Sequence, residues 1–208
     1  MIRKGGLSMK EDKFKVAWGI TGSGDKLKET LEIMTKLKQK YGKKVEIEVF
    51  LSKAAEQVAK YYKINDRLNT GFSSFWVEEN ANKPFLAGRI QLGEFRFFLV
   101  APATSNTVAK IAHGVSDTLV TNSVIQALKT SVPVFIMPCD YYEGEITTTL
   151  PNGNSLKLRV RKEDADNVRL LESMEGLKPF EKPEEIVDIF KGELGLVNYG
   201  LHPSNKSR

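Results

Sequence analysis

The stretch FFLVAPATSNTVAK, which runs from Phe97 to Lys110, decides the fold of this chain. Its first half is an unbroken apolar run, which is typical of a parallel strand buried on both faces. The run stops at Pro102, and the polar residues Thr104 to Thr107 follow before a segment with helical spacing begins. In open α/β sheets, ligands bind at the carboxyl ends of the strands. The stretch therefore predicts a ligand site at the end of a buried central strand.

Strand-like and helix-like segments alternate on both sides of this stretch. Apolar runs at 14–20, 45–50 and 132–137 predict three further strands, and helical spacing recurs at 27–42, 52–59, 117–130, 164–174 and 183–190. Between Ile146 and Val160, two alternating runs flank a turn at Pro151–Asn154, which predicts a β-hairpin. Because strands that alternate with helices form right-handed parallel units, we expect an α/β fold. Its core is a Rossmann-like doubly wound parallel sheet with helices on both faces, and the hairpin near Ile146–Val160 is an addition.

The segment from Asn65 to Gly88 has no clean period, and we interpret it as a long loop. Aromatic-rich loops of this kind are often lids or contacts between subunits, although ordinary packing in a core or interface is an equal alternative. Its large aromatic residues are Phe72, Phe75, Trp76 and Phe85.

Length and composition favour one soluble domain. The 208 residues, with 41% hydrophobic and 27% charged residues, predict a flexible arm at 1–12, a single domain at 13–200 and a flexible tail at 201–208. The chain contains neither an apolar run of the roughly 20 residues that a membrane helix needs nor a signal-peptide pattern, so we expect a cytoplasmic protein without a membrane partner. One cysteine and two histidines are too few for a metal site. The net charge of +5 is mild and scattered, which favours a solvated surface over nucleic-acid binding and leaves room for an acidic partner.

Three loops are predicted to meet at the carboxyl edge of the sheet: Gly19–Gly24, Ser52–Ala54 and Pro102–Thr107. Glycines in the first let the backbone approach a ligand, and helix N-termini hold phosphates. Taken singly, the first loop is equally compatible with a turn that binds no ligand. The second loop taken alone is more typical of a plain helix cap. Asp25 is unfavourable at an anion site because its negative charge would repel the anion, although Lys26 could offset this charge. Together the loops predict one phosphate and one planar polar ring, which suits a mononucleotide better than NAD.

At this point the chain resembles a known family. The run APATSNTVAKIA at 101–112, with Gly114, Asp117–Leu119 and Asn122, is similar to the signature of the homo-oligomeric flavin-containing cysteine decarboxylases, a flavoprotein superfamily. The loops at Gly19 and Ser52 match the same family, and the resemblance covers roughly residues 15–137. The segment 138–140, the hairpin and residues 168–176 look most like the archaeal branch, which contains archaeoflavoprotein and dihydromethanopterin reductase.

The resemblance implies FMN as the cofactor, held between subunits of a homo-oligomer that is a trimer or a multiple of trimers. It places the phosphate at the first two loops and the ribityl chain and isoalloxazine ring at the third. The cofactor-binding residues implied in this way are Gly22, Ser23, Ser52, Lys53, Ala101, Pro102, Thr104, Ser105, Asn106, Thr107 and Cys139.

Two departures from the family pattern argue against cysteine decarboxylation. Arg89 opens an Arg-Ile-Gln-Leu segment where the decarboxylases carry a histidine, and arginine cannot act as a general base. Asp140 stands where they use an asparagine to hold the substrate carboxylate. Arg89 and Asp140 are therefore the candidate catalytic residues, with Arg89 expected to place a positive charge near the flavin and Thr104 or Ser105 to donate a hydrogen bond to it.

The remaining candidates for chemistry are weaker. Cys139 is either a redox thiol or a small buried residue, with the second favoured. His113 is expected to pack or to cap a helix, and His202 lies in the tail.

The resemblance, together with the two departures at Arg89 and Asp140, points first to an FMN-dependent oxidoreductase. It would take electrons from a ferredoxin-like donor and pass them to a small acceptor, for which the resemblance suggests dihydromethanopterin. A carboxy-lyase like phosphopantothenoylcysteine decarboxylase and a non-catalytic flavin-binding protein are the alternatives.

Overall fold

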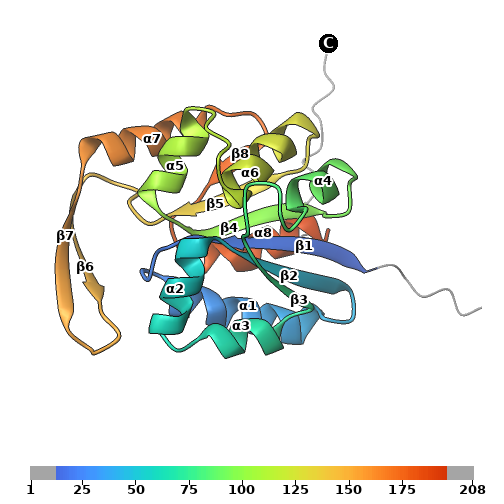
Figure 1. Cartoon of the computed structure of the whole chain (residues 1–208), viewed down its shortest axis with the longest axis horizontal. Coiled ribbons are helices and arrows are strands. Elements are labelled where there is room, and N and C mark those ends of the chain that lie inside the picture. The colour runs from blue at the N-terminus through green and yellow to red at the C-terminus, as the bar shows by residue number, and fades with distance from the viewer. Residues whose placement is uncertain (1–12, 196–208) are drawn as a thin grey trace, which may run out of the picture.

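The computed structural model of the chain describes residues 13–195, which form a three-layer α/β fold (Figure 1). Six parallel strands form one sheet in the order β3-β2-β1-β4-β5-β8. Numbered along the chain, these strands follow the 3-2-1-4-5-6 order of the Rossmann fold, so the predicted fold class is confirmed. The strands are β1 (Phe14–Ile20), β2 (Val45–Leu51), β3 (Ser74–Val77), β4 (Phe97–Ala103), β5 (Val134–Pro138) and β8 (Leu177–Pro179).

Helices cover both faces of the sheet. Side chains from α1 (Leu27–Tyr41), α2 (Lys53–Tyr61), α3 (Asn65–Gly71) and α8 (Glu185–Glu193) join the core on one face. Side chains from α4 (Leu86–Gln91), α5 (Ser105–Ala112), α6 (Leu119–Lys129) and α7 (Lys162–Glu172) join the core on the other.

Alternation along the central strands divides the core between the two faces. On β4, Phe97 and Leu99 pack on the α1 side, whereas Phe98 and Val100 pack on the α5 side, and all four are fully buried. Burying such a side chain contributes about 1.5–3 kcal/mol, so β4 is strongly held from both sides. The strand must therefore end where this apolar run ends, and its polar continuation lies at the sheet edge.

Two strands were missed by the sequence interpretation, and the long loop expected at 65–88 is wrong. This segment contains α3, β3 and the start of α4. The strands β3 and β8 have four and three residues and lie at the two edges of the sheet. Runs this short cannot display a period, so strand pairing rather than local pattern defines them.

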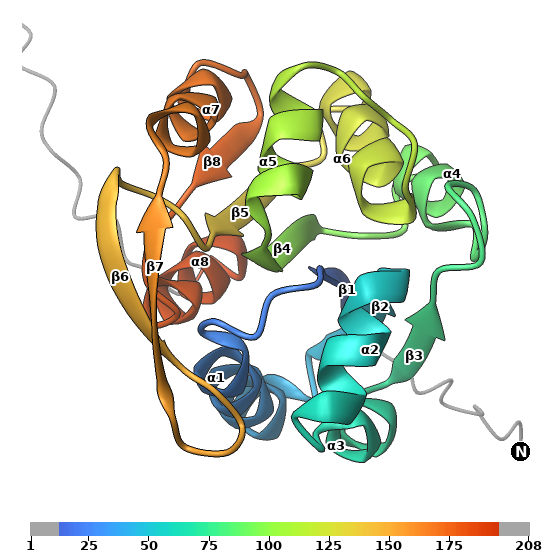
Figure 2. The same cartoon turned by 60° about the vertical axis from the view of Figure 1, so that its left-hand side comes forward.

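The predicted hairpin is present as β6 (Gly144–Thr149) and β7 (Ser155–Val160), with Ile146 opposite Leu158. It forms a separate two-stranded sheet that stands beside the carboxyl edge of the main sheet (Figure 2). The flexible arm predicted at 1–12, the tail at 201–208 and His202 lie outside the described residues. Among residues 13–195, every helix is too short or too polar to cross a bilayer.

Candidate functional site

Two adjoining cavities lie at the carboxyl edge of the sheet, where the three predicted loops meet. The first, of about 440 Å³, lies between the N-termini of α2 and α5 and is called the α2–α5 cavity. The second, of about 300 Å³, lies under β6 and β7 and is called the hairpin cavity. Gly22 and Thr104 line both, so the two form one connected site. The α2–α5 cavity also contains Ser52, Lys53, Asn106, Thr107 and Glu78, and the hairpin cavity contains Ser23, Ser105, Cys139 and Asp140.

Thr21 joins the loop after β1 to the loop after β4. Its hydroxyl donates to the carbonyl of Pro102 at 3.1 Å and accepts from the amide of Thr104 at 2.8 Å. The Thr21 amide also donates to Pro102 at 3.1 Å. Because Thr21 is 2% exposed, these bonds are shielded from water and hold the two loops in a fixed relation.

Small residues allow the β1 loop to approach its neighbours closely. A Cβ on Gly22 would lie 2.6 Å from the Cβ of Ala54 in α2. A Cβ on Gly24 would lie 2.3 Å from the hydroxyl of Tyr62. Both contacts are impossible for a larger residue without movement, so the two glycines set the width of the site.

Glu78 is a site residue that sequence reasoning missed. It follows β3 directly, and its carboxylate accepts from the amide of Lys53, the first residue of α2, at 3.1 Å. The other oxygen accepts from the amide of Leu119, the first residue of α6, at 3.0 Å. Glu78 thus joins two helix N-termini, where a negative charge is favourable. Recognising the short strand β3 would have placed Glu78 at this edge.

The second and third predicted loops begin their helices as expected. The Ser52 hydroxyl caps α2 by accepting from the amide of Ala55 at 3.0 Å. The Thr104 hydroxyl caps α5 by accepting from the amide of Thr107 at 3.3 Å. The Ser52 hydroxyl retains its own proton and can still donate to a ligand. The Thr104 hydroxyl also lies 3.0 Å from the Thr107 hydroxyl, and either of the two can donate to the other.

The candidate residues Ser105 and Asp140 face each other in the hairpin cavity. The Ser105 hydroxyl donates to the carboxylate of Asp140. This bond links the start of α5 to the loop after β5 and keeps an anionic group beside the hydroxyls of the site.

Cys139 lies in the wall of the hairpin cavity as a buried residue. Burial raises the pKa of its thiol to about 12, and a hydrogen bond with Ser23 opposes that shift only in part. A thiol of this kind is protonated at neutral pH and is a poor nucleophile. The interpretation of Cys139 as a small buried residue accords with this environment.

Arg89 does not line either cavity, so the structure does not bring it beside the other candidates. Its guanidinium makes a bidentate pair with Glu48, at 2.7 and 2.9 Å, and a third bond to Glu94 at 3.0 Å. The hydrogen bonds to Glu48 and Glu94 raise the pKa of Arg89 above its ordinary value. Arg89 therefore pairs with carboxylates outside the two cavities. The positive charge expected near the cofactor is not supplied by Arg89 within this chain.

Three further candidates, Ala101, Pro102 and His113, do not line either cavity. Ala101 and Pro102 are buried in β4, and their carbonyls accept from Trp18 and Thr21 respectively, so they position the loop. His113 ends α5 as an exposed residue, with its ring nitrogen 3.1 Å from the Asn167 side chain. The helix-capping expectation for His113 holds and the packing expectation does not.

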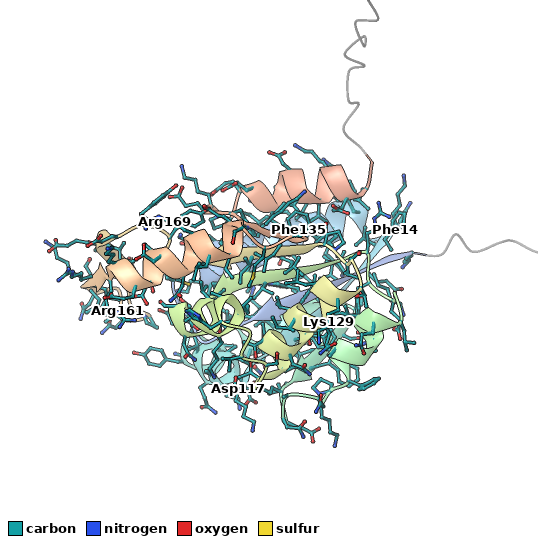
Figure 3. All side chains as sticks on the ribbon, turned by 90° about the horizontal axis from the view of Figure 1, so that it is seen from above. Phe14, Asp117, Lys129, Phe135, Arg161 and Arg169 are labelled. Carbon is teal, nitrogen blue, oxygen red and sulfur yellow. The ribbon has the colours of Figure 1, made fainter. Side chains whose placement is uncertain are left out.

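A larger cavity, of about 600 Å³, lies at the opposite edge of the sheet. Phe14, at the start of β1, lines it, and Figure 3 shows Phe14 far from Arg161 at the hairpin end. Two ion pairs lie among its lining residues, Lys15 with Glu94 at 3.9 Å and Arg96 with Glu193 at 3.5 Å. Ligands of open α/β sheets bind at the carboxyl edge, so we assign the site to the two smaller cavities.

The chemistry of the site follows from these groups. Hydroxyls, Lys53 and the helix amides that Glu78 does not occupy suit a phosphate in the α2–α5 cavity, and the hairpin cavity has room for a planar ring. Within residues 13–195, no three His, Cys, Asp or Glu side chains are grouped to hold a metal ion.

Comparison with known proteins places this geometry among flavin proteins. The sequence model of the family named Flavoprotein matches residues 6–194. An uncharacterized protein of Methanocaldococcus jannaschii is 52% identical over 83% of this chain and 91% of its own length. Dihydromethanopterin reductase (acceptor) of the same organism is 29% identical over 85% of this chain and 95% of its own length. The crystal structure of Burkholderia xenovorans DmrB with FMN, described as a cubic protein cage for redox transfer, superposes with a TM-score of 0.76. It is 31% identical and covers 89% of this chain and 98% of that one.

Proposed function

The chain belongs to the Flavoprotein family, and from this we propose that it binds FMN and acts as an FMN-dependent oxidoreductase. The observation that carries the proposal is the connected pair of cavities at the carboxyl edge of the sheet. One cavity offers phosphate-binding groups, and the other has room for a ring. The bound flavin would supply one- and two-electron transfer chemistry.

The residues of the α2–α5 cavity fit a ribityl phosphate. Gly22 lets the backbone pass close to α2, and the hydroxyl-bearing Ser52 and the basic Lys53 line the same cavity. Thr104 and Asn106 add side-chain donors at the start of α5. These groups would hold the phosphate and the ribityl hydroxyls, and Thr104 and Ser105 would orient the ring.

The charge of the hairpin cavity favours redox chemistry over decarboxylation. A decarboxylase must bind the carboxylate of its substrate. Here Asp25 and Asp140 line the cavity, and no Lys, Arg or His among the described residues does so. A substrate carboxylate would therefore meet two acidic groups and no counter-charge, which supports an oxidoreductase over a carboxy-lyase.

We assign a ferredoxin-like protein as the electron donor and a small molecule, with dihydromethanopterin as the candidate, as the acceptor. The acceptor proposal is supported by the two dihydromethanopterin reductases among the relatives, from Methanocaldococcus jannaschii and Methanosarcina mazei. The net charge of +5 supports an acidic donor, because opposite charges raise the association rate. Reduction by ferredoxin should slow as ionic strength rises; a rate independent of salt would contradict this docking.

The protein is also proposed to assemble as a trimer or a multiple of trimers. Trp76 on the edge strand β3, Phe85 and Leu92 are 42%, 62% and 75% exposed in a single chain. Large apolar side chains gathered around one edge are typical of subunit contacts. Light scattering over a range of concentrations would give the mass, and a stable monomer would contradict the assembly.

The test of the proposed function is cofactor binding followed by reduction. The full-length protein is loaded in parallel with FMN, riboflavin and FAD, and its flavin absorbance and binding affinity are measured. We expect FMN to bind more tightly than riboflavin, because only FMN carries the phosphate. Ser52→Ala should narrow this difference. Protein that binds no flavin would overturn the proposal, and bound FMN that ferredoxin cannot reduce would favour the non-catalytic alternative.

A further inference from the structure

Asp25 is the one acidic residue of the β1 loop, and the proposed phosphate site does not use it. It is half-buried and lines both the hairpin cavity and the adjoining groove between α1 and the hairpin. The hydroxyl of Thr148 in β6 donates to its Oδ1 at 3.4 Å. At that distance the bond is weak, so a better donor could replace it.

The surroundings of Asp25 leave its charge without close compensation. The adjacent Lys26 lines the outer groove with Asp25, but its ammonium group donates to the carbonyl of Glu181 at 3.1 Å and forms no ion pair with Asp25 among the described residues. Lys26 therefore does not neutralise Asp25 in the way that the sequence suggested. Burial raises the pKa of Asp25, the Lys26 charge opposes this shift, and Glu29 and Asp140 add to it. A ligand that offers N–H donors would relieve this unfavourable burial.

The flavin ring is proposed to lie beside Thr104 and Ser105, and the hairpin adds apolar walls to the same cavity against which a second flat ring can stack. Ile146 and Leu158 lie opposite each other on the hairpin and line the cavity together with Tyr62. The two connected cavities, of about 300 and 440 Å³, together provide the space for the flavin and for this second ring. Apolar groups on the walls and carboxyl groups at the rim suit a planar heterocycle with N–H donors along one edge.

We propose that Asp25 selects the electron acceptor by binding the adjacent N–H groups of a 2-amino-4-oxo heterocycle of the dihydropterin class. This inference rests on the proposed function and assigns its substrate recognition to one residue. The ring N–H and the neighbouring amino group of such a heterocycle are two parallel donors, which match the two oxygens of a carboxylate. A 2,4-dioxo ring of the same shape places a carbonyl oxygen where the amino group was. It would point an acceptor at Asp25 and lose a charge-assisted hydrogen bond.

The experiment compares two probes on the full chain loaded with oxidised FMN. Binding of 6-methyl-7,8-dihydropterin and 6-methyl-7,8-dihydrolumazine is measured anaerobically by titration calorimetry, without turnover. We expect the wild-type protein to bind the pterin about 10- to 100-fold more tightly. Asp25→Asn should bring the ratio close to one. Glu29→Gln is the matched control, because Glu29 is exposed on α1 and lines only the outer groove, and it should keep the wild-type ratio.

Each outcome decides between the two proposals. Wild-type protein that binds both probes equally overturns the assignment even if Asp25→Asn does not fold. Asp25→Asn that keeps its flavin and the wild-type preference overturns it as well. In both cases FMN binding and reduction by ferredoxin would leave the proposed function standing. A chain that never binds FMN overturns the proposed function itself.

Discussion

Replacing Glu78 tests whether one carboxylate holds the two helix N-termini of the site. Glu78 is 9% exposed, and its oxygens accept from the amides of Lys53 at 3.1 Å and Leu119 at 3.0 Å. A hydrogen bond to a charged group contributes about 1.5–3 kcal/mol. Because Glu78 lines a cavity that water can enter, the lower figure applies to each bond. Glu78→Ala should therefore lower the free energy of unfolding by about 3 kcal/mol.

This loss is large enough to measure by thermal unfolding of the flavin-free protein. For a domain of this size, each kcal/mol shifts Tm by about 2–4 °C, so Tm should fall by about 6–12 °C. Glu78→Gln keeps one acceptor oxygen and should lose about half as much. Circular dichroism and calorimetry at neutral pH give both values.

Glu79 provides the matched control. It is the next residue, and it pairs with Lys83 at 2.8 Å on the surface, with both side chains 60% or more exposed. Exposed pairs contribute about 0–1 kcal/mol, so Glu79→Ala should change Tm by little. Equal Tm values for Glu78→Ala and Glu79→Ala would refute the role assigned to Glu78. Equal losses for Glu78→Ala and Glu78→Gln would show that both bonds depend on the charge.

Three further predictions concern the sheet and the site. Arg89→Met should lower the free energy of unfolding by about 3–5 kcal/mol at neutral pH, because it leaves buried Glu48 without its cationic partner and with a hydrogen bond from Trp76 at 3.3 Å. Burial raises the pKa of Glu48, but the hydrogen bonds and the positive charge of Arg89 lower it by more. The pKa of Glu48 therefore lies below its ordinary value of 4.5. The pair thus stabilises the fold above that pH, and the difference between wild type and variant in urea unfolding should shrink in acid. Gly22→Ala, whose Cβ would lie 2.6 Å from a side chain of α2, should weaken FMN binding about tenfold or more in equilibrium titration; unchanged affinity would contradict the close approach. With a pKa of about 12, native Cys139 should resist iodoacetamide at pH 8 and react once the protein is denatured, and rapid labelling of the native protein would disprove its burial.

The sequence was most informative where a long apolar run meets polar residues. Phe97–Ala103 had to be buried, and its polar continuation had to lie at the sheet edge, because unpaired polar groups are costly inside a core. The three loops at Gly22, Ser52 and Thr104 were predicted together, and the structure brings them together. Each signal is local, since it consists of a period, a cap or a turn within about ten residues.

Tertiary structure alone decided the rest. Glu78 became a site residue because β3, only four residues long, pairs with β2 and carries it to the carboxyl edge. Arg89 lies outside the expected site because its guanidinium binds the carboxylate of Glu48, which stands 41 positions earlier in the chain. Asp25 gained a cavity because the hairpin, some 123 positions later, stands over it. Such pairings join residues distant in the chain, and their energies depend on burial and on partners that no local pattern contains.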